Sequence, residues 1–365
     1  MSALLFGFII TVIATVIVRR IALRYNIVDQ PEVAPERKVH TRATPLLGGI
    51  AIFVGFFVTV AILSQSSGVV TGVGVLPKYL WGLLIGSSIL MIGGYLDDRY
   101  RLSPGVQILF PLAATLVIIG SGIGVRFITN PFGGVIRLDT VNVGLFSWHG
   151  VTYHLTLWAD IFTFVWILGM TYTTKFLDGL DGLVSGITAI GSIIVYVLSV
   201  RPPVMQNDTA NLAIILAGVC LGFLIFNWHP ARIFLGEGGS LLTGFLLGSL
   251  AIISGGKIAT ALLIMGIPIL DVAWVIIRRV FIEHRSPFRT SDRKHLHFRL
   301  LDVGFSHRGS VVFLYALTAI FGATTLFFHG IQKLIALLCL VAVMVILGIF
   351  LVLAVRRRNA SSTTL

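Results

Sequence analysis

Apolar runs of about 20 residues recur along almost the whole chain. A helix of roughly that length crosses the hydrocarbon core of a bilayer, where only helices and closed barrels satisfy their own backbone hydrogen bonds. Charged residues make up 12% of the sequence, against about 25% in soluble domains. We therefore predict an all-α polytopic membrane protein with about 11 transmembrane helices, at residues 3–23, 46–64, 79–96, 105–123, 157–175, 183–200, 210–227, 240–254, 258–277, 311–328 and 333–355.

The distribution of lysine and arginine predicts how these helices are oriented. With the N-terminus outside, six of the 27 Lys and Arg residues fall on the outer side: Lys78, Arg126, Arg137, Arg201, Lys257 and Lys333. The remaining 21 fall on the other side, and loops rich in these residues stay in the cytoplasm. We predict a multi-pass protein of the inner (plasma) membrane with its C-terminus in the cytoplasm. The same rule accounts for the net charge of +12, so no nucleic-acid partner is expected.

We expect one integral membrane domain at residues 1–355, followed by a polar cytoplasmic tail at 356–365. The outer side has one sizeable loop, at residues 124–156. It contains runs of β-branched residues together with Asn-Pro and Gly-Gly turn signals, a pattern that predicts a small hairpin.

The conspicuous polar clusters fall on the predicted cytoplasmic side. Five of their acids lie at or near the ends of apolar runs: Asp97, Asp98, Asp178, Asp181 and Glu237. Asp178 and Asp181 would share one face of a helix if that helix continued so far. Asp97 and Asp98 could also form an ordinary solvated helix end. Five acids near one interface are typical of a hard divalent cation, and Mg²⁺ prefers a few carboxylates together with phosphate oxygens.

Basic residues gather on the same side. Arg293, His295, His297 and Arg299 alternate in the loop before residue 311, and a second basic group comprises Arg37, Lys38 and His40. Arginine and histidine together suit a diphosphate, whereas two histidines without thiolates at ligand spacing are a weak zinc signal. The residues thus predict a membrane enzyme with a metal and diphosphate site at its cytoplasmic face.

Five segments in order resemble the motifs of one known family. They are VDQPE…RKVHTRATPLLGG, DDRYRLSP, TKFLDGLDGLVSG, NWHPARIFLGEGGSLLTG and DRKHLHFRLLDVGFSHR. Together they span about residues 29 to 310 and resemble the polyprenyl-phosphate N-acetylhexosamine-1-phosphate transferases. The RKVH segment and the His-Leu-His form of the last motif favour the branch that starts O-antigen and teichoic acid glycans over the phospho-MurNAc-pentapeptide branch.

The resemblance implies a reaction. UDP-N-acetylhexosamine and polyprenyl phosphate would give polyprenyl-diphospho-N-acetylhexosamine and UMP, with Mg²⁺ or Mn²⁺ as cofactor, as the first membrane step of a cell-envelope glycan. N-acetylglucosamine 1-phosphate would be the group transferred, and the protein could form a homodimer. The alternative is a catalytically silent lipid-diphosphate binder or flippase, although a transporter should carry charge within its spans, where only Asp160 and Asp271 lie.

The resemblance also implies a role for each matching residue. Asp97 and Asp98 would position or deprotonate the lipid phosphate, and Asp178 and Asp181 would lie by the nucleotide and the metal. The metal ligands would be Asp98, Asp181 and Glu237. The substrate-binding residues would be Arg37, Lys38, His40, Asn227, Arg293, His295, His297 and Arg299.

Three positions depart from the family pattern. The family usually has asparagine at Lys175 and aspartate at Glu237, both of which it uses for metal, and often lysine at Gln107. We consider three interpretations. Lys175 and Glu237 could form an ion pair that partly or wholly replaces the cation. Glu237 could still bind Mg²⁺ with neighbouring aspartates while Lys175 points at a phosphate. Lys175 could also merely extend to the membrane interface.

Overall fold

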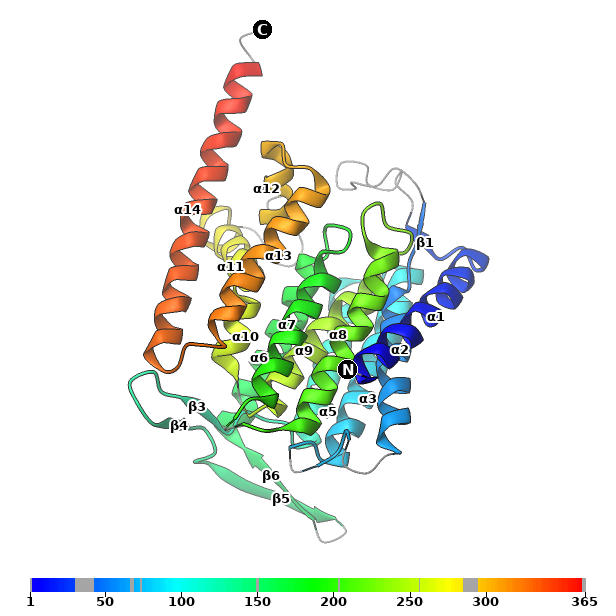
Figure 1. Ribbon diagram of the computed structural model, residues 1–365, viewed down its shortest axis with the longest axis vertical. Coiled ribbons are helices and arrows are strands. Elements are labelled where there is room, and N and C mark those ends of the chain that lie inside the picture. Colours follow the sequence, from blue (N-terminus) through cyan, green and yellow to red (C-terminus); the bar gives the residue numbers. More distant parts are fainter. Residues whose placement is uncertain are drawn as a thin grey trace.

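The structure, a computed structural model, describes residues 2–29, 43–65, 69–72, 74–148, 151–202, 204–255, 257–284 and 295–362. It is a bundle of helices with a few short strands (Figure 1). The helices are α1 Ser2–Arg24, α2 Gly48–Ser64, α3 Pro77–Tyr100, α4 Pro104–Gln107, α5 Leu109–Gly120, α6 Leu157–Leu177, α7 Leu183–Val200, α8 Asn207–Asn227, α9 Gly236–Ile253, α10 Ile258–Ile264, α11 Gly266–Ile277, the π-helix η1 Arg278–Ile282, α12 Leu296–Val303, α13 His307–Thr324 and α14 Ile331–Ser362.

The mostly helical architecture predicted for a membrane protein is confirmed. Every predicted span overlaps a helix or a pair of consecutive helices. Within the described residues, six helices are individually long and apolar enough to cross a bilayer: α1, α3, α7, α8, α9 and the Ile331–Val355 part of α14. Helix α2 and the α4–α5 segment are apolar but shorter. The number of spans and their orientation remain predictions.

Helices α10 and α11 form a broken pair, bent by 77°. The break lies where Pro268 enters the first turn of α11. Proline has no N–H to donate to the carbonyl four residues earlier, here that of Ile264, and its ring crowds that carbonyl. If the pair is one span, seven segments of the described chain qualify as membrane-crossing.

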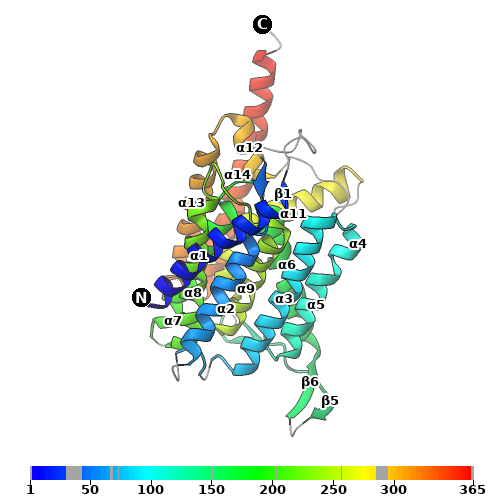
Figure 2. The same cartoon turned by 90° about the vertical axis from the view of Figure 1, so that its right-hand side faces the viewer.

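The loop predicted to hold one hairpin holds two. Strand β3 (Phe127–Thr129) pairs antiparallel with β4 (Val135–Arg137), and β5 (Asn142–Trp148) with β6 (Val151–Thr156). A third small pair joins β1 (Val28–Asp29) to β2 (Thr44–Pro45). The β5–β6 hairpin lies at the end of the bundle opposite to β1 and α12 (Figures 1 and 2). The two ends of the bundle therefore carry different structures.

Helix α9 is the centre of the bundle, and α2, α3, α6, α7 and α8 pack against it. Every residue of α9 is buried except Glu237, at its first turn. The Trp166 indole of α6 donates a hydrogen bond of 3.1 Å to the carbonyl of Gly248 in α9. The one partly exposed residue of this central helix is thus the acid that the sequence marked as functional.

Two glycines let α1 and α8 approach closely. A Cβ atom added to Gly218 would lie 2.2 Å from the carbonyl oxygen of Leu4, and one added to Gly222 would lie 2.6 Å from that of Phe8. Gly218 and Gly222 are four residues apart, the spacing of small residues that brings helices together in membranes. The contact holds α1 in place beside the bundle.

We therefore expect Gly218→Ile to separate these helices. Overpacking of this kind costs about 1–3 kcal/mol, so the melting temperature of the detergent-solubilised variant should fall by several degrees. Gly169→Ile is the matched control, because a Cβ added to Gly169 of α6 would meet no atom within 4 Å. Equal melting temperatures of the two variants would show that the close approach of α1 and α8 does not limit stability.

Candidate active site

The site predicted from the sequence lies at the end of the bundle that carries β1, α4 and α12 (Figure 2). Three segments supply its acids. Asp97 and Asp98 lie in the last turns of α3, Asp178 and Asp181 in the turn between α6 and α7, and Glu237 in the first turn of α9. The side chains divide into two groups, one around Lys175 and one around Asp181.

The first group is a chain of contacts through Lys175. Its Nζ forms an ion pair with Oε1 of Glu237 and donates to Oε1 of Gln107 over 3.2 Å. The Gln107 Nε2 donates over 2.8 Å to Oδ1 of Asp97. The Glu237 N–H donates over 3.1 Å to Oδ1 of Asp98. The three positions that depart from the family pattern, Lys175, Gln107 and Glu237, therefore lie in one chain of contacts. The ion pair that we considered for Lys175 and Glu237 is present.

Electrostatic coupling links these acids to the turn between α6 and α7. The charges of Glu237, Asp97 and Asp178 act on Asp98, and those of Glu237 and Asp181 act on Asp178. Asp178 lies at the exposed surface, although burial is the largest of the causes that raise the pKa of its carboxyl group to about 7. Like charges this close repel one another, and among the described residues of this group Lys175 is the cation that offsets them.

The second group fixes Asp181. Its Oδ2 lies 2.7 Å from Nδ1 of His229 and accepts a hydrogen bond of 3.1 Å from the N–H of Ala231. Its own N–H donates over 2.9 Å to Nε2 of His307. The two imidazole rings stack with centroids 3.9 Å apart. Asp181 thus joins the turn between α6 and α7 to the loop after α8 and to the start of α13.

Asn227 holds the same turn from within the protein. Its Oδ1 accepts hydrogen bonds from the Gly182 N–H and the Ser185 hydroxyl, at 3.0 and 3.2 Å, and its Nδ2 donates to the carbonyl of Ile233 over 3.0 Å. The side chain is 4% exposed. Both ends of the amide are therefore engaged structurally, and the predicted contact of Asn227 with substrate remains a prediction.

The histidines of the His-Leu-His segment are both buried. His295 Nδ1 lies 2.9 Å from Oδ2 of Asp271 in α11, and Oδ1 of that acid accepts the Leu296 N–H over 2.8 Å. The ring of His297 stacks on that of His295 at 5.7 Å and packs against Gly179, where an added Cβ would lie 2.1 Å from Nε2. Burial lowers the pKa of His297 to about 3, so this ring is neutral near pH 7.

Several predicted residues lie outside the described part of the chain, namely Arg37, Lys38, His40 and Arg293. Three contacts in the site leave no signal in the sequence: that of Gln107 with Lys175, and those of His229 and His307 with Asp181. Asp271 was visible in the sequence only as a charge within a span. A charge in an apolar span is itself a functional signal, and here it anchors the histidine segment.

The acids have the right chemistry for a divalent cation, but they do not form a complete ligand set. Asp98, Asp178 and Glu237 offer the oxygen atoms that Mg²⁺ prefers, and an added Cβ at Gly236 would lie 2.4 Å from Oδ2 of Asp98, so glycine leaves that oxygen room. Among the described residues, however, the one group of three or more such side chains whose ligand atoms all lie within 4.8 Å of one another is Asp181, His229 and His307. The expected set of Asp98, Asp181 and Glu237 is therefore divided between the two groups.

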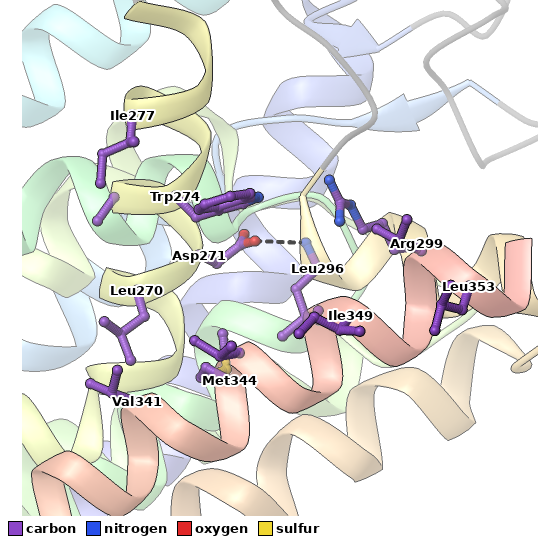
Figure 3. A pocket seen from close by; sticks show the side chains of 14 residues that line it. Leu270, Asp271, Trp274, Ile277, Leu296, Arg299, Val341, Met344, Ile349 and Leu353 are labelled. Carbon is purple, nitrogen blue, oxygen red and sulfur yellow. Dashed lines mark hydrogen bonds between the residues drawn. The ribbon is translucent and has the colours of Figure 1, made fainter. Parts of the chain in front are cut away.

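An apolar cavity of about 400 Å³ lies between α11, α12 and α14 (Figure 3). Its polar members are Asp271 and Arg299, beside the histidine segment. The wall is otherwise apolar and is formed by Leu270, Ala273, Trp274, Ile277, Leu296, Val341, Met344, Val345, Gly348, Ile349, Val352 and Leu353. The Leu296 N–H donates a hydrogen bond to Asp271 at the edge of the cavity, which joins α12 to α11 (Figure 3).

Comparison with known proteins gives matches over most of the chain. The family model of glycosyl transferase family 4 matches residues 80–255. A probable undecaprenyl-phosphate N-acetylglucosaminyl 1-phosphate transferase of Bacillus subtilis is 33% identical over 330 residues, which cover 89% of this chain and 83% of that protein. A decaprenyl-phosphate N-acetylglucosaminephosphotransferase of Mycolicibacterium smegmatis is 32% identical, covering 96% and 87%. A phospho-N-acetylmuramoyl-pentapeptide-transferase of Moorella thermoacetica is 28% identical, covering 80% and 86%.

Proposed function

Because the chain belongs to glycosyl transferase family 4, among the polyprenyl-phosphate sugar-1-phosphate transferases, we propose that its donor is UDP-N-acetylhexosamine and that N-acetylglucosamine is the sugar. The transfer of a sugar 1-phosphate to polyprenyl phosphate then starts a cell-envelope glycan. The observation that carries the proposal is the match to N-acetylglucosamine-1-phosphate transferases over 89% and 96% of the chain.

The proposed step is a displacement at phosphorus. An oxygen of the lipid phosphate attacks the β-phosphorus of UDP-N-acetylglucosamine, the bond from that phosphorus to the bridging oxygen breaks, and UMP leaves. A phosphate with a second pKa near 6 is already largely ionised at neutral pH. The protein therefore has mainly to align the two phosphates and offset their charge. Carboxylates repel phosphates, so Asp98 and Asp178 would serve this step by holding the divalent cation between them and the substrates.

Mg²⁺ or Mn²⁺ is the cofactor of this proposal. Asp98, Asp178 and Glu237 would hold the ion, which supplies positive charge to the transferring phosphate when it is bound. Asp181 is tied to His229 and Ala231, so its contribution is to position the turn that carries Asp178.

The two acids within the spans have structural partners, which weighs against a flippase. Asp160 accepts the Thr156 N–H over 2.8 Å, and Asp271 holds the histidine segment. A transport pathway would require such charges to face a water-filled passage.

The homodimer expected from the resemblance remains a prediction.

In the proposed orientation, the acid site lies on the cytoplasmic face of the plasma membrane. The chain then crosses the membrane 11 times, with its N-terminus and its hairpins outside. The support is the excess of Lys and Arg on the predicted inner side together with the location of the acids and the hairpins at opposite ends of the bundle (Figure 1). UDP-sugars are soluble, so their site must face the compartment that supplies them.

The cavity between α11 and α14 is proposed to hold part of the prenyl chain. The cavity is lined mostly by apolar side chains of α11 and α14, and Arg299 beside it would offer positive charge to a phosphate group. A prenyl chain shares the apolar character of this wall, and its phosphate would then lie near the histidine segment (Figure 3).

The reaction is tested with purified protein, polyprenyl phosphate and a panel of UDP-sugars, with UMP release as the measurement. We expect UMP release with UDP-N-acetylglucosamine, and we expect EDTA to abolish that release.

Asp98→Asn should lower turnover by about 100-fold, a loss of about 2.7 kcal/mol in transition-state stabilisation. Asp139→Asn is the matched control, because Asp139 pairs with exposed Arg137 at the far end of the molecule. Failure to release UMP from any UDP-sugar would refute the proposed donor.

The orientation is tested by cysteine labelling in intact cells. In a background with Cys220→Ala and Cys339→Ala, we expect Ser103→Cys to react only with a membrane-permeant thiol reagent. Thr140→Cys, beside the hairpins, should react with an impermeant one. Both positions are exposed. Labelling of Ser103→Cys by the impermeant reagent would reverse the proposed orientation.

The prenyl site is tested by filling the cavity with Gly348→Phe. A Cβ added to Gly348 would meet no atom within 4 Å, so the ring should occupy space in the cavity without disturbing the helix. We expect the KM for polyprenyl phosphate to rise about tenfold or more while the KM for the donor stays the same. Gly169→Phe on α6 is the matched control. An unchanged lipid KM in Gly348→Phe would exclude this cavity as the site of the chain.

A further inference from the structure

Lys175 places a fixed positive charge among the acids. The side chains of Lys175 and of its ion-pair partner Glu237 are each 20% exposed. The ammonium also bonds to Oε1 of Gln107 and lies 5.8 Å from the centre of the Tyr172 ring. An anion, an amide oxygen and an aromatic face are all favourable partners of an ammonium. The lysine is therefore held at the acids rather than extended into solvent.

Gln107 is oriented so as to receive this ammonium. Its Nε2 donates to Oδ1 of Asp97 over 2.8 Å and to the carbonyl of Leu102 over 3.0 Å. Two acceptors on the amide nitrogen leave the amide oxygen for a donor, and that donor is Lys175. The contact thus connects the ends of α3, α4 and α6.

This arrangement disfavours the binding of a divalent ion by the protein alone, without the nucleotide. The ammonium occupies Oε1 of Glu237, and it would repel a second cation. The described carboxylates of the Lys175 group do not bring three ligand atoms within 4.8 Å of one another. The carboxyl groups of Asp97, Asp98, Asp178 and Glu237 nevertheless offer oxygen atoms of the kind that a divalent ion binds. Mg²⁺ typically takes one or two carboxylates and completes its coordination with substrate phosphates.

We propose that Lys175 is the counter-ion of the acids in the resting enzyme, and that the divalent ion binds tightly only together with the diphosphate of the donor. The inference rests on the proposed function, because it requires a nucleoside diphosphate as the ligand. Lys175 is then a positioning residue that makes metal binding depend on nucleotide. The pair of Lys175 and Glu237 replaces the ion in the resting site but not in the loaded one.

The test measures metal binding directly. Mn²⁺ is titrated into the purified full-length protein in detergent, and the free ion is followed by electron paramagnetic resonance with and without UDP. We expect UDP to tighten Mn²⁺ binding to the wild-type protein by about tenfold or more, after allowance for the Mn²⁺ that UDP binds in solution. Lys175→Met keeps the length of the side chain and removes its charge. It should bind Mn²⁺ about tenfold more tightly without UDP, and UDP should then have a smaller effect.

Lys257→Met is the matched control, because Lys257 bonds to the Ser199 hydroxyl away from the acids. It should reproduce the wild-type titrations. Wild-type binding of Mn²⁺ that is equally tight with and without UDP would overturn the inference, and that result needs no variant. So would an unchanged affinity in folded Lys175→Met. If either result came from a preparation that releases UMP from a UDP-sugar, the proposed function would stand and this inference alone would fail.

Discussion

The turn between α6 and α7 is held by side chains from several distant segments, and the rest of the site depends on this hold. Asn227 at the end of α8 bonds to the Gly182 N–H, and Tyr315 of α13 donates to the Gly182 carbonyl. His307 accepts the Asp181 N–H. Backbone groups in an apolar bundle are costly unless they are bonded, so these partners fix the turn. Its exposed acid, Asp178, thereby acquires a defined place.

Charge is the second constraint on the site. Acids from three segments lie close enough to affect one another, and repulsion of that kind must be offset. Lys175 offsets part of it, and the ends of α3, α4, α6 and α9 are joined as a result. The proposed binding of a divalent ion together with the phosphates of the donor would depend on these same acids.

The apolar helices determine where the side chains of the candidate site lie. Helix α9 is buried along its whole length except at Glu237, so it fixes that acid at the end of the bundle. The bend at Pro268 directs α11 toward α12, where Asp271 anchors His295. Asp271 and Leu296 also line the apolar cavity between α11 and α14. The proposed prenyl site and the histidine segment would therefore adjoin.

The sequence by itself determined the helical membrane architecture and the family, and it pointed to the acids of the candidate site. Apolar length and the ordered motifs are local properties, and they do not depend on how the helices pack. The departures at Lys175 and Glu237 were visible too, and an ion pair between them could be anticipated from their charges. Gln107 was noted as a departure, but its role was not, because its amide could face any of several neighbours.

Only the tertiary structure decided how the acids are divided. Asp178 and Asp181 are three residues apart, yet one is exposed and the other is bound by His229 and Ala231. His297, in α12, is buried against Gly179 although the sequence around it is rich in charge. These outcomes depend on which side chains of α8, α12 and α13 reach the turn between α6 and α7. Contacts between residues 48 to 126 positions apart leave no local pattern in the sequence, because distance along the chain says nothing of distance in the bundle.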